Sequence, residues 1–249
     1  MSSSLWQTLE ELKKKKWVDL THPLDNASPY WDGMPDGVLS LADVAVPYES
    51  MNLCIQTFTF PGQMGTHIDY PAHFIPGGRL AGDFDLKETV LPLVVIDLSE
   101  KVKTNPDYEI TVQDILDFET LNGCIPKDAF VAMRTDWSQR WPDAKALANA
   151  DAAGNEHFPG WTIDVLKFLY DQRAVAATGH ETLDTDAAVT STAVGDLQAE
   201  RFVLARNKFQ LEAMAHLNEV PATGSLIVIA APHIVEANGL PVRAWAILP

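Results

Sequence analysis

The chain has 249 residues, of which 47% are hydrophobic and 21% are charged, a composition typical of a globular protein with a sizeable buried core. Its net charge of −16, from 34 acidic and 18 basic side chains, disfavours partners with negatively charged surfaces. We therefore expect no nucleic acid and no anionic membrane among its partners.

The N-terminal segment, residues 1–16, predicts a helix. Leu5, Leu9 and Leu12 recur at helical spacing, and Ser3 or Ser4 could cap the helix. The segment lacks the basic region followed by an apolar stretch that marks a signal peptide, and no run approaches the roughly 20 apolar residues of a membrane span.

The chain has two cysteines, Cys54 and Cys124, which are far apart in the sequence. They have no metal-binding spacing, and two thiols do not form a disulfide framework. We expect both to be buried and reduced, and the protein to be cytoplasmic.

The first third of the chain predicts mainly β-structure. WVDLTHPL, residues 17–24, favours a short strand that ends at Pro23, and residues 27–37 form a Pro/Gly-rich loop that carries Tyr30 and Trp31. MNLCIQTFTF, residues 51–60, alternates and is rich in β-formers, so a strand is expected to run into the next segment.

Strands alternate with helices from about residue 90 onwards. Helices are predicted at residues 111–123, with Thr111 as cap and Gly123 as end, and at 159–173. Residues 197–217 mix the two signals. We predict one α/β domain over residues 1–249, with a mixed sheet flanked by helices. Its later strands are expected at 91–100, 129–137, 174–186, 225–234 and 240–248.

Residues 62–74, GQMGTHIDYPAHF, gather groups that can bind a metal: Gln63, His67, Asp69 and His73. All are separated by even numbers of residues, so on an extended chain they can point to one side of a strand. Pro71 marks where regular strand pairing must stop, so His73 is expected just past the strand, free to bend inward. Gly65 would leave room there for a ligand or ion. Two imidazoles, a carboxylate and an amide oxygen suit a divalent cation, whereas a single histidine is usually structural.

Two later segments add acidic groups. GHETLDTD places His180, Glu181, Asp184 and Asp186 at the end of a predicted strand, where α/β proteins form sites, although a polar loop is the simpler interpretation. Glu212 lies among apolar neighbours in FQLEAM, where a carboxylate is costly to bury unless it is paired or binds metal.

With these motifs the chain resembles the cyclase family of metal-dependent hydrolases, which includes bacterial kynurenine formamidases and isatin hydrolases. Its signature, His-x-Gly-Thr-His-x-Asp-x-Pro-x-His-Phe, matches QMGTHIDYPAHF at every fixed position except the first. Blocks along nearly the whole chain follow the family in order. The resemblance implies a cyclase-like swivelling β/β/α fold and a homodimer or homotetramer.

The resemblance also implies roles for individual residues. His67, Asp69 and Glu212 fall on metal-ligand positions, and His73 falls on the proton-transfer position. An aromatic pocket wall is implied near Trp31, to which Tyr30 and Phe74 could contribute. Core packing is an equally good interpretation of each of these aromatics. His180 and Gln210 could support the ligands through hydrogen bonds.

Two positions depart from the family. Gln63 stands where the first histidine ligand is expected, and Glu200 stands where a second-site histidine is expected. Both can ligate through oxygen, which moves the preference from Zn²⁺ toward Mn²⁺ or Mg²⁺. We expect one or two ions, Mn²⁺ or Zn²⁺.

The implied function is hydrolysis of a small amide or lactam at a non-peptide C–N bond. Hydroxide from metal-bound water would attack the carbonyl, and His73 would shuttle the proton. Three alternatives stay open: a lactone hydrolase, a metal-binding protein without turnover, and a structural subunit without a site. The two departures argue against copying N-formylkynurenine as the substrate.

Overall fold

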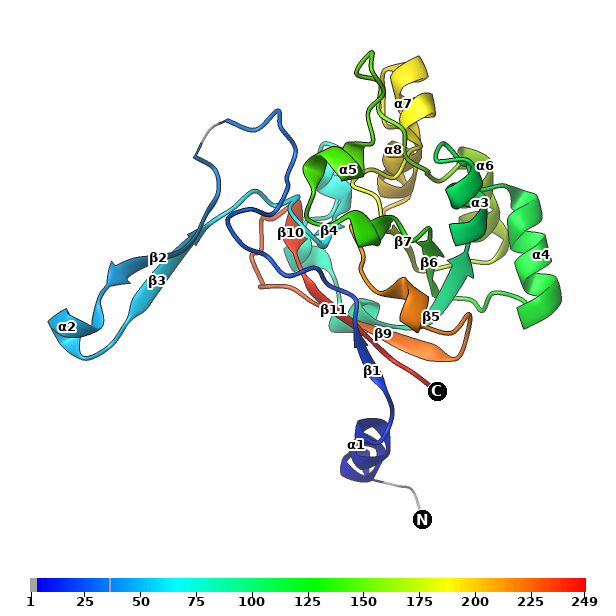
Figure 1. The fold of residues 1–249 in the computed structure, drawn as a ribbon. Helices are drawn as coiled ribbons and strands as arrows, with labels where there is room; N and C mark the ends of the chain where they lie inside the picture. The colour runs from blue at the N-terminus through cyan, green and yellow to red at the C-terminus, as the bar shows by residue number, and fades with distance from the viewer. Residues whose placement is uncertain (1–3, 36) are drawn as a thin grey trace.

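A computed structural model describes residues 4–35 and 37–249, and its centre is a nine-stranded mixed sheet (Figure 1). The strand order is β1-β11-β9-β5-β6-β7-β8-β4-β10. Strands β5 to β8 run parallel, and the strands outside them pair antiparallel. The bounds are β1 Trp17–Asp19, β4 His67–Asp69, β5 Val90–Asp97, β6 Phe130–Arg134, β7 Ala177–His180, β8 Gln210–Glu212, β9 Ser225–Ala230, β10 Gly239–Pro241 and β11 Arg243–Ile247.

Helices gather beside the parallel part of the sheet (Figure 1). The α-helices there are α3 Ser99–Thr104, α4 Val112–Asn122, α5 Ala144–Ala148, α6 Ile163–Lys167, α7 Ala188–Val194 and α8 Gln198–Ala205. Short 3₁₀ turns are η1 Pro71–His73, η2 Ala81–Asp83, η3 Leu86–Thr89, η4 Trp137–Arg140 and η6 Leu217–Glu219, and α6 continues as the π-helical η5 Phe168–Gln172. None of the helices in the described part of the chain is long and apolar enough to cross a membrane.

Two hydrophobic clusters cover the two faces of the sheet. Val94 and Ile96 of β5 pack with helices α4 and α6 on one face, whereas Leu93 and Val95 pack with the outer strands on the other. The outer strands can supply that second cluster because the large sheet curls. The continuous apolar run of β5 is thus explained by burial on both faces, and the predicted mixed α/β fold with flanking helices is confirmed.

The helix predictions agree closely with the structure at residues 111–123. Thr111 caps α4 in a capping box with Asp114, and Gly123 ends the helix. The N-terminal helix α1, Leu5–Lys13, is capped by Ser4, while Ser3 lies outside the described residues. It ends before residue 16 and buries none of its residues.

A hairpin projects away from the main sheet (Figure 1). It consists of β2 Ser40–Val46, the one-turn helix α2 Tyr48–Met51 and β3 Ile55–Thr59. The strand predicted at 51–60 therefore exists as β3, but it forms this separate hairpin, which we call the arm, and stops before residues 62–74. The prediction that both cysteines are buried is wrong, because Cys54 is half-buried and Cys124 is exposed.

Candidate metal centre

The candidate site forms where β4 and β8 pair antiparallel. His67 lies opposite Glu212, and Asp69 lies opposite Gln210. Directly opposed residues of antiparallel strands place their side chains on the same face, and so do residues two apart on one strand. The register of two three-residue strands thus brings four polar side chains together within the buried sheet.

His67, Asp69 and Glu212 form the first candidate metal-binding group. The Nε2 atom of His67 lies 3.5 Å from Asp69 Oδ2 and 3.5 Å from Glu212 Oε2. All three side chains are buried, and one possible ligand atom from each lies within 4.8 Å of the others. The Nδ1 atom of His67 lies 2.9 Å from the Gly65 carbonyl, which can accept its proton and leave Nε2 free to ligate.

Asp69, His73 and Glu200 form a second such group, which shares Asp69 with the first. His73 Nε2 lies 3.8 Å from Glu200 Oε1 and 4.0 Å from Asp69 Oδ1. Turn η1 presents His73, and the first turn of α8 presents Glu200. Asp186 holds that helix start, since it accepts hydrogen bonds from the backbone N–H groups of Ala199 (2.8 Å) and Glu200 (3.1 Å).

Gln63 does not lie on the strand that carries His67 and Asp69, so that part of the sequence interpretation is wrong, whereas His73 lies just past the strand, as Pro71 predicted. Only His67–Asp69 is a strand, and His73 reaches the site from a 3₁₀ turn. Gly65 adopts a φ of +59°, and a Cβ there would lie 2.3 Å from Leu24 Cδ2. Gly65 therefore serves a left-handed turn and close packing, and the space beside it is filled by Leu24 and not left open for an ion.

The Gln63 amide lies beside the first group, and its nitrogen donates to Asp69 Oδ1 at 3.4 Å. A Cβ on Gly239 of β10 would lie 2.0 Å from that nitrogen, so the glycine is what makes room for the amide. In this orientation Gln63 is a donor to Asp69. A metal-ligand role requires the amide to rotate so that its oxygen faces the site.

Gln210 and Thr185 hold Glu212 through hydrogen bonds, and His180 lies beside it. Gln210 donates to Glu212 Oε1 at 2.9 Å, and the single proton of the Thr185 hydroxyl is shared between Gln210 Oε1 (2.9 Å) and Glu212 Oε1 (3.1 Å). His180 Nε2 lies 3.3 Å from the same carboxylate, but neither ring nitrogen has a hydrogen-bond partner among the described residues. Burial lowers the pKa of His180 to about 3, so its imidazole is neutral at pH 7.

The remaining polar residues after β7 have separate functions. Glu181 accepts hydrogen bonds from Thr135 and Ser138, so it braces the neighbouring strand end. Asp184 is half-buried near the site, and burial together with nearby carboxylates raises its pKa to about 6. The acidic residues predicted at 180–186 therefore act separately. Glu181 braces a strand end, Asp186 holds the start of α8, and Asp184 adds negative charge near the site.

The carboxylates of the two groups lie close enough to repel one another. Burial raises the pKa of Glu200 well above its usual range, and the charges of Asp69 and Asp184 add to the effect. Burial and the charge of Glu200 do the same for Glu212. Burial opposes a charged His67, but the adjacent Asp69 outweighs it and raises the pKa of the imidazole. Buried like charges at this spacing favour a bound cation.

The donor set fits a divalent metal ion. Imidazole nitrogen with two carboxylates is a common set for Zn²⁺ and Mn²⁺, and the carboxylate-rich second group suits the harder ions. Both ring nitrogens of the buried His180 lack a hydrogen-bond partner among the described residues, so the polar groups around the site are not all paired within the protein. An ion could be held by His67, Asp69 and Glu212, by Asp69, His73 and Glu200, or by both groups at once.

The three aromatics predicted to line a substrate pocket lie in different settings. Tyr30 forms an isolated β-bridge with Met64, which brings the aromatic loop to the motif. Phe74 meets the edge of the His73 ring at a centroid distance of 4.8 Å. Trp31 is 69% exposed, and its ring covers Gly33. Its role in substrate binding stays a prediction.

The sequence interpretation missed Thr66, His22 and Trp141. Thr66 accepts a hydrogen bond from the backbone N–H of His22 at 2.9 Å and donates to the Ala213 carbonyl at 2.6 Å, which ties three segments together beside His67. The buried His22 ring stacks on Trp141 with centroids 4.5 Å apart. Thr66 lies inside the GTHID segment of the motif, which could have drawn attention to it. Nothing in the local sequence THPL indicates that His22 stacks on Trp141.

Comparison with known proteins shows the family of this chain. The model of the Cyclase family matches residues 18–187. Isatin hydrolase from Roseibium aggregatum is 33% identical over 189 residues, which cover 74% of this chain and 71% of that protein. Kynurenine formamidase from Bacillus anthracis is 34% identical over 88 residues, 35% of this chain and 41% of that protein.

A solved structure extends the likeness over the whole fold. Isatin hydrolase A from Labrenzia aggregata, bound to benzyl benzoate, superposes with a TM-score of 0.88 at 32% identity and covers 99% of both chains. The resemblance drawn from QMGTHIDYPAHF is therefore confirmed. By its sequence and its fold, this chain belongs to the Cyclase family.

Proposed function

We propose that this protein is a metal-dependent hydrolase that cleaves the C–N bond of a small amide or lactam. The observation that carries the proposal is the pair of donor groups that share the buried Asp69. The relatives support the reaction class, because isatin hydrolase and kynurenine formamidase both act on C–N bonds.

The residues of the site divide the work between holding an ion and moving a proton. His67, Asp69 and Glu212 would hold the first ion, and Asp69 with Glu200 would contribute to a second. When bound, a divalent ion lowers the pKa of a coordinated water and polarises a substrate carbonyl. Gln210 and Thr185 keep Glu212 aimed at the site through their hydrogen bonds.

His73 is suited to proton transfer. Burial lowers the pKa of His73 despite the opposing charge of Asp69, so the imidazole is neutral at pH 7 and can accept a proton. It is also more exposed than His67, with 27% of its side chain accessible against 5%. A rim position lets it reach the leaving nitrogen of a substrate, to which it would return the proton. Because His73 also lies beside Glu200, it could instead be a ligand of the metal ion.

The experiment combines metal analysis with turnover. Protein loaded with Mn²⁺ or Zn²⁺ is assayed against isatin, N-formylkynurenine and a small lactone, and bound metal is counted by atomic emission. We expect hydrolysis of at least one amide or lactam. Full metal occupancy without hydrolysis of any of them would favour a binding protein, and hydrolysis of the lactone alone would favour the ester alternative.

His73→Gln separates the two roles of that residue. If His73 shuttles a proton, the variant keeps its metal and loses turnover by about two to four orders of magnitude, the usual contribution of a general acid–base group. If His73 is a ligand, metal content falls with activity. His233→Gln, at an exposed histidine, is the matched control and should change neither quantity.

We also propose that the protein works as a homo-oligomer in which the arm is covered by a second copy. A hairpin of two strands is only marginally stable alone in water, yet both strands of the arm are largely exposed. Its apolar side chains Val44, Tyr48, Met51, Ile55 and Phe58 are each at least 50% exposed.

Two further proposals concern location and domain organisation. The two free thiols support a reducing compartment, and we propose the cytoplasm. The pairing of β1 with β11 joins the two ends of the chain in one sheet, which supports a single domain over residues 1–249.

A further inference from the structure

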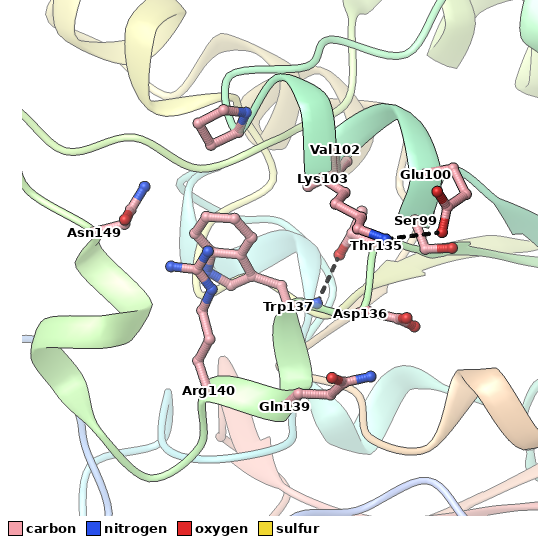
Figure 2. Close-up of a pocket in the computed structure, with 11 residues that line it drawn as sticks. Ser99, Glu100, Val102, Lys103, Thr135, Asp136, Trp137, Gln139, Arg140 and Asn149 are labelled. Atoms are coloured by element: carbon pink, nitrogen blue, oxygen red, sulfur yellow. Dashed lines mark hydrogen bonds and ion pairs between the residues drawn. The ribbon is translucent and has the colours of Figure 1, made fainter.

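A cavity of about 550 Å³ lies between α3, η4 and the turn that follows β6 (Figure 2). None of its lining residues belongs to either metal-binding group. It opens beside the carboxyl ends of the parallel strands β5 and β6, the edge at which α/β sheets usually bind ligands. Its volume lies within the usual range for small-molecule sites, about 300–1,000 Å³.

Arg140, in the wall of this cavity, differs from every other arginine of the chain. Among the described residues, no carboxylate lies within 4.0 Å of its guanidinium, although the protein carries a net charge of −16. The arginines that do have a carboxylate partner are Arg79, Arg134, Arg173, Arg201, Arg206 and Arg243.

The Arg140 guanidinium is nevertheless held in place. Its carbon lies 3.6 Å from the centroid of the Trp137 ring, and one terminal nitrogen donates to the Ala146 carbonyl at 2.7 Å. The buried Trp137 is itself fixed, because its ring nitrogen donates to the Leu147 carbonyl at 3.0 Å. Figure 2 shows the side chain lying along the tryptophan. An arginine fixed in this way presents its remaining donors with little further loss of entropy.

The cavity is lined by two basic side chains, Lys103 and Arg140, and two acidic ones, Glu100 and Asp136, and the acidic pair already has cationic partners. Asp136 is occupied by Arg134, whose Nε and terminal nitrogen reach its two oxygens at 2.7 and 3.1 Å. Lys103 lies 3.7 Å from Glu100, but both side chains are largely exposed, and such pairs contribute little. Lys103 and Arg140 thus offer positive charge from two walls of the same cavity.

We propose that this cavity is a second binding site, for a small organic carboxylate whose oxygens are received by the Arg140 guanidinium with Lys103 nearby. The planar guanidinium matches a carboxylate in geometry as well as charge. Val102, Pro106 and Trp137 line the same space and would contact an apolar body, and the volume exceeds what a bare inorganic ion requires. The site is independent of the proposed hydrolysis.

The test is calorimetric titration of the metal-loaded protein with benzoate, and with benzamide as the neutral analogue. We expect benzoate to bind, benzamide to bind at least about 10-fold more weakly, and Arg140→Gln to weaken benzoate by about 10- to 100-fold, as the loss of a charge-assisted pair predicts. Arg206→Gln is the matched control. Arg206 also stacks on an aromatic ring, Phe202 at 3.8 Å, but is paired with Asp171, so benzoate affinity should not change.

Other results would overturn the proposal. Equal benzoate affinity in the parent and in Arg140→Gln would place benzoate elsewhere, and undetectable binding to the parent would remove the site. If inorganic phosphate displaced benzoate at equal concentration, the cavity would be a general anion site and not a site for an organic carboxylate. If Arg140→Gln unfolds, judged by circular dichroism, Arg140→Lys and Lys103→Gln replace it, and each must weaken benzoate for the assignment to hold.

Discussion

His67 and Glu212 face each other across β4 and β8, with Nε2 and Oε2 3.5 Å apart in a fully buried setting. They come from segments far apart in the sequence, so the pairing of two short strands creates the contact. Asp69 lies on the same face and joins both candidate metal groups. The predictions below test this arrangement, the fold beside it and the arm.

Asp69→Asn should abolish retention of the metal through gel filtration. Asp69 is the carboxylate common to both groups, and its loss removes one negative charge while leaving the side-chain volume unchanged. Metal content by atomic emission is the measurement. Asp117→Asn, an exposed change on α4, is the control and should retain metal fully. Full metal occupancy in Asp69→Asn would show that Asp69 is not a ligand and would contradict the assignment of this site.

Gln63→His should shift the metal preference toward Zn²⁺, because a nitrogen donor would replace an oxygen at the edge of the first group. Competition between Mn²⁺ and Zn²⁺ for the metal-free protein measures the change. Gln56→His on the exposed strand β3 is the control. If the preference is the same in both variants and in the parent, then Gln63 is not a ligand and acts only as a donor to Asp69.

We expect the folded protein to lose stability in mild acid because of His22. Burial, with a smaller effect from His216, lowers the pKa of His22 from 6.5 to about 4. The folded state therefore favours the neutral ring, and its contribution is complete above pH 6.5 and is lost as the pH falls toward about 4. The expected loss is roughly 3 kcal/mol of the free energy of unfolding.

His22→Phe keeps a ring stacked on Trp141 and removes the titration. Urea unfolding of the parent and the variant across this pH range should show a steeper decline for the parent. His233→Phe, at an exposed histidine, should decline as steeply as the parent. Parallel curves for the parent and His22→Phe would show that His22 does not titrate in this range.

Phe58→Asp should convert an oligomer to monomers. Phe58 is 59% exposed on β3, and a second copy covering the arm would have to bury the new charge. Light scattering coupled to gel filtration gives the mass. Leu121→Asp, at an exposed leucine of α4, is the control and should keep the parent's mass. A parent protein that is monomeric would rule out the covered arm.

Local pattern was sufficient where a structural signal lay within one segment. The capping box at Thr111, the apolar run of β5 and the order of strands and helices after residue 90 follow from short-range propensity and from burial on both faces. The members of the two candidate metal-binding groups also stood out in the sequence, because imidazoles and carboxylates among apolar neighbours need a partner or an ion.

The tertiary structure decided how those residues meet. Even spacing suggested one strand face for Gln63, His67 and Asp69, but the left-handed turn at Gly65 separates Gln63 from the strand, and His73 follows the strand on a 3₁₀ turn. Glu212 and Glu200 reach the site through the β4–β8 register and through a helix start held by Asp186. The sequence by itself determined which groups are available and the class of ion they suit. Which of them lie within 4 Å depended on long-range strand pairing, which no local period encodes.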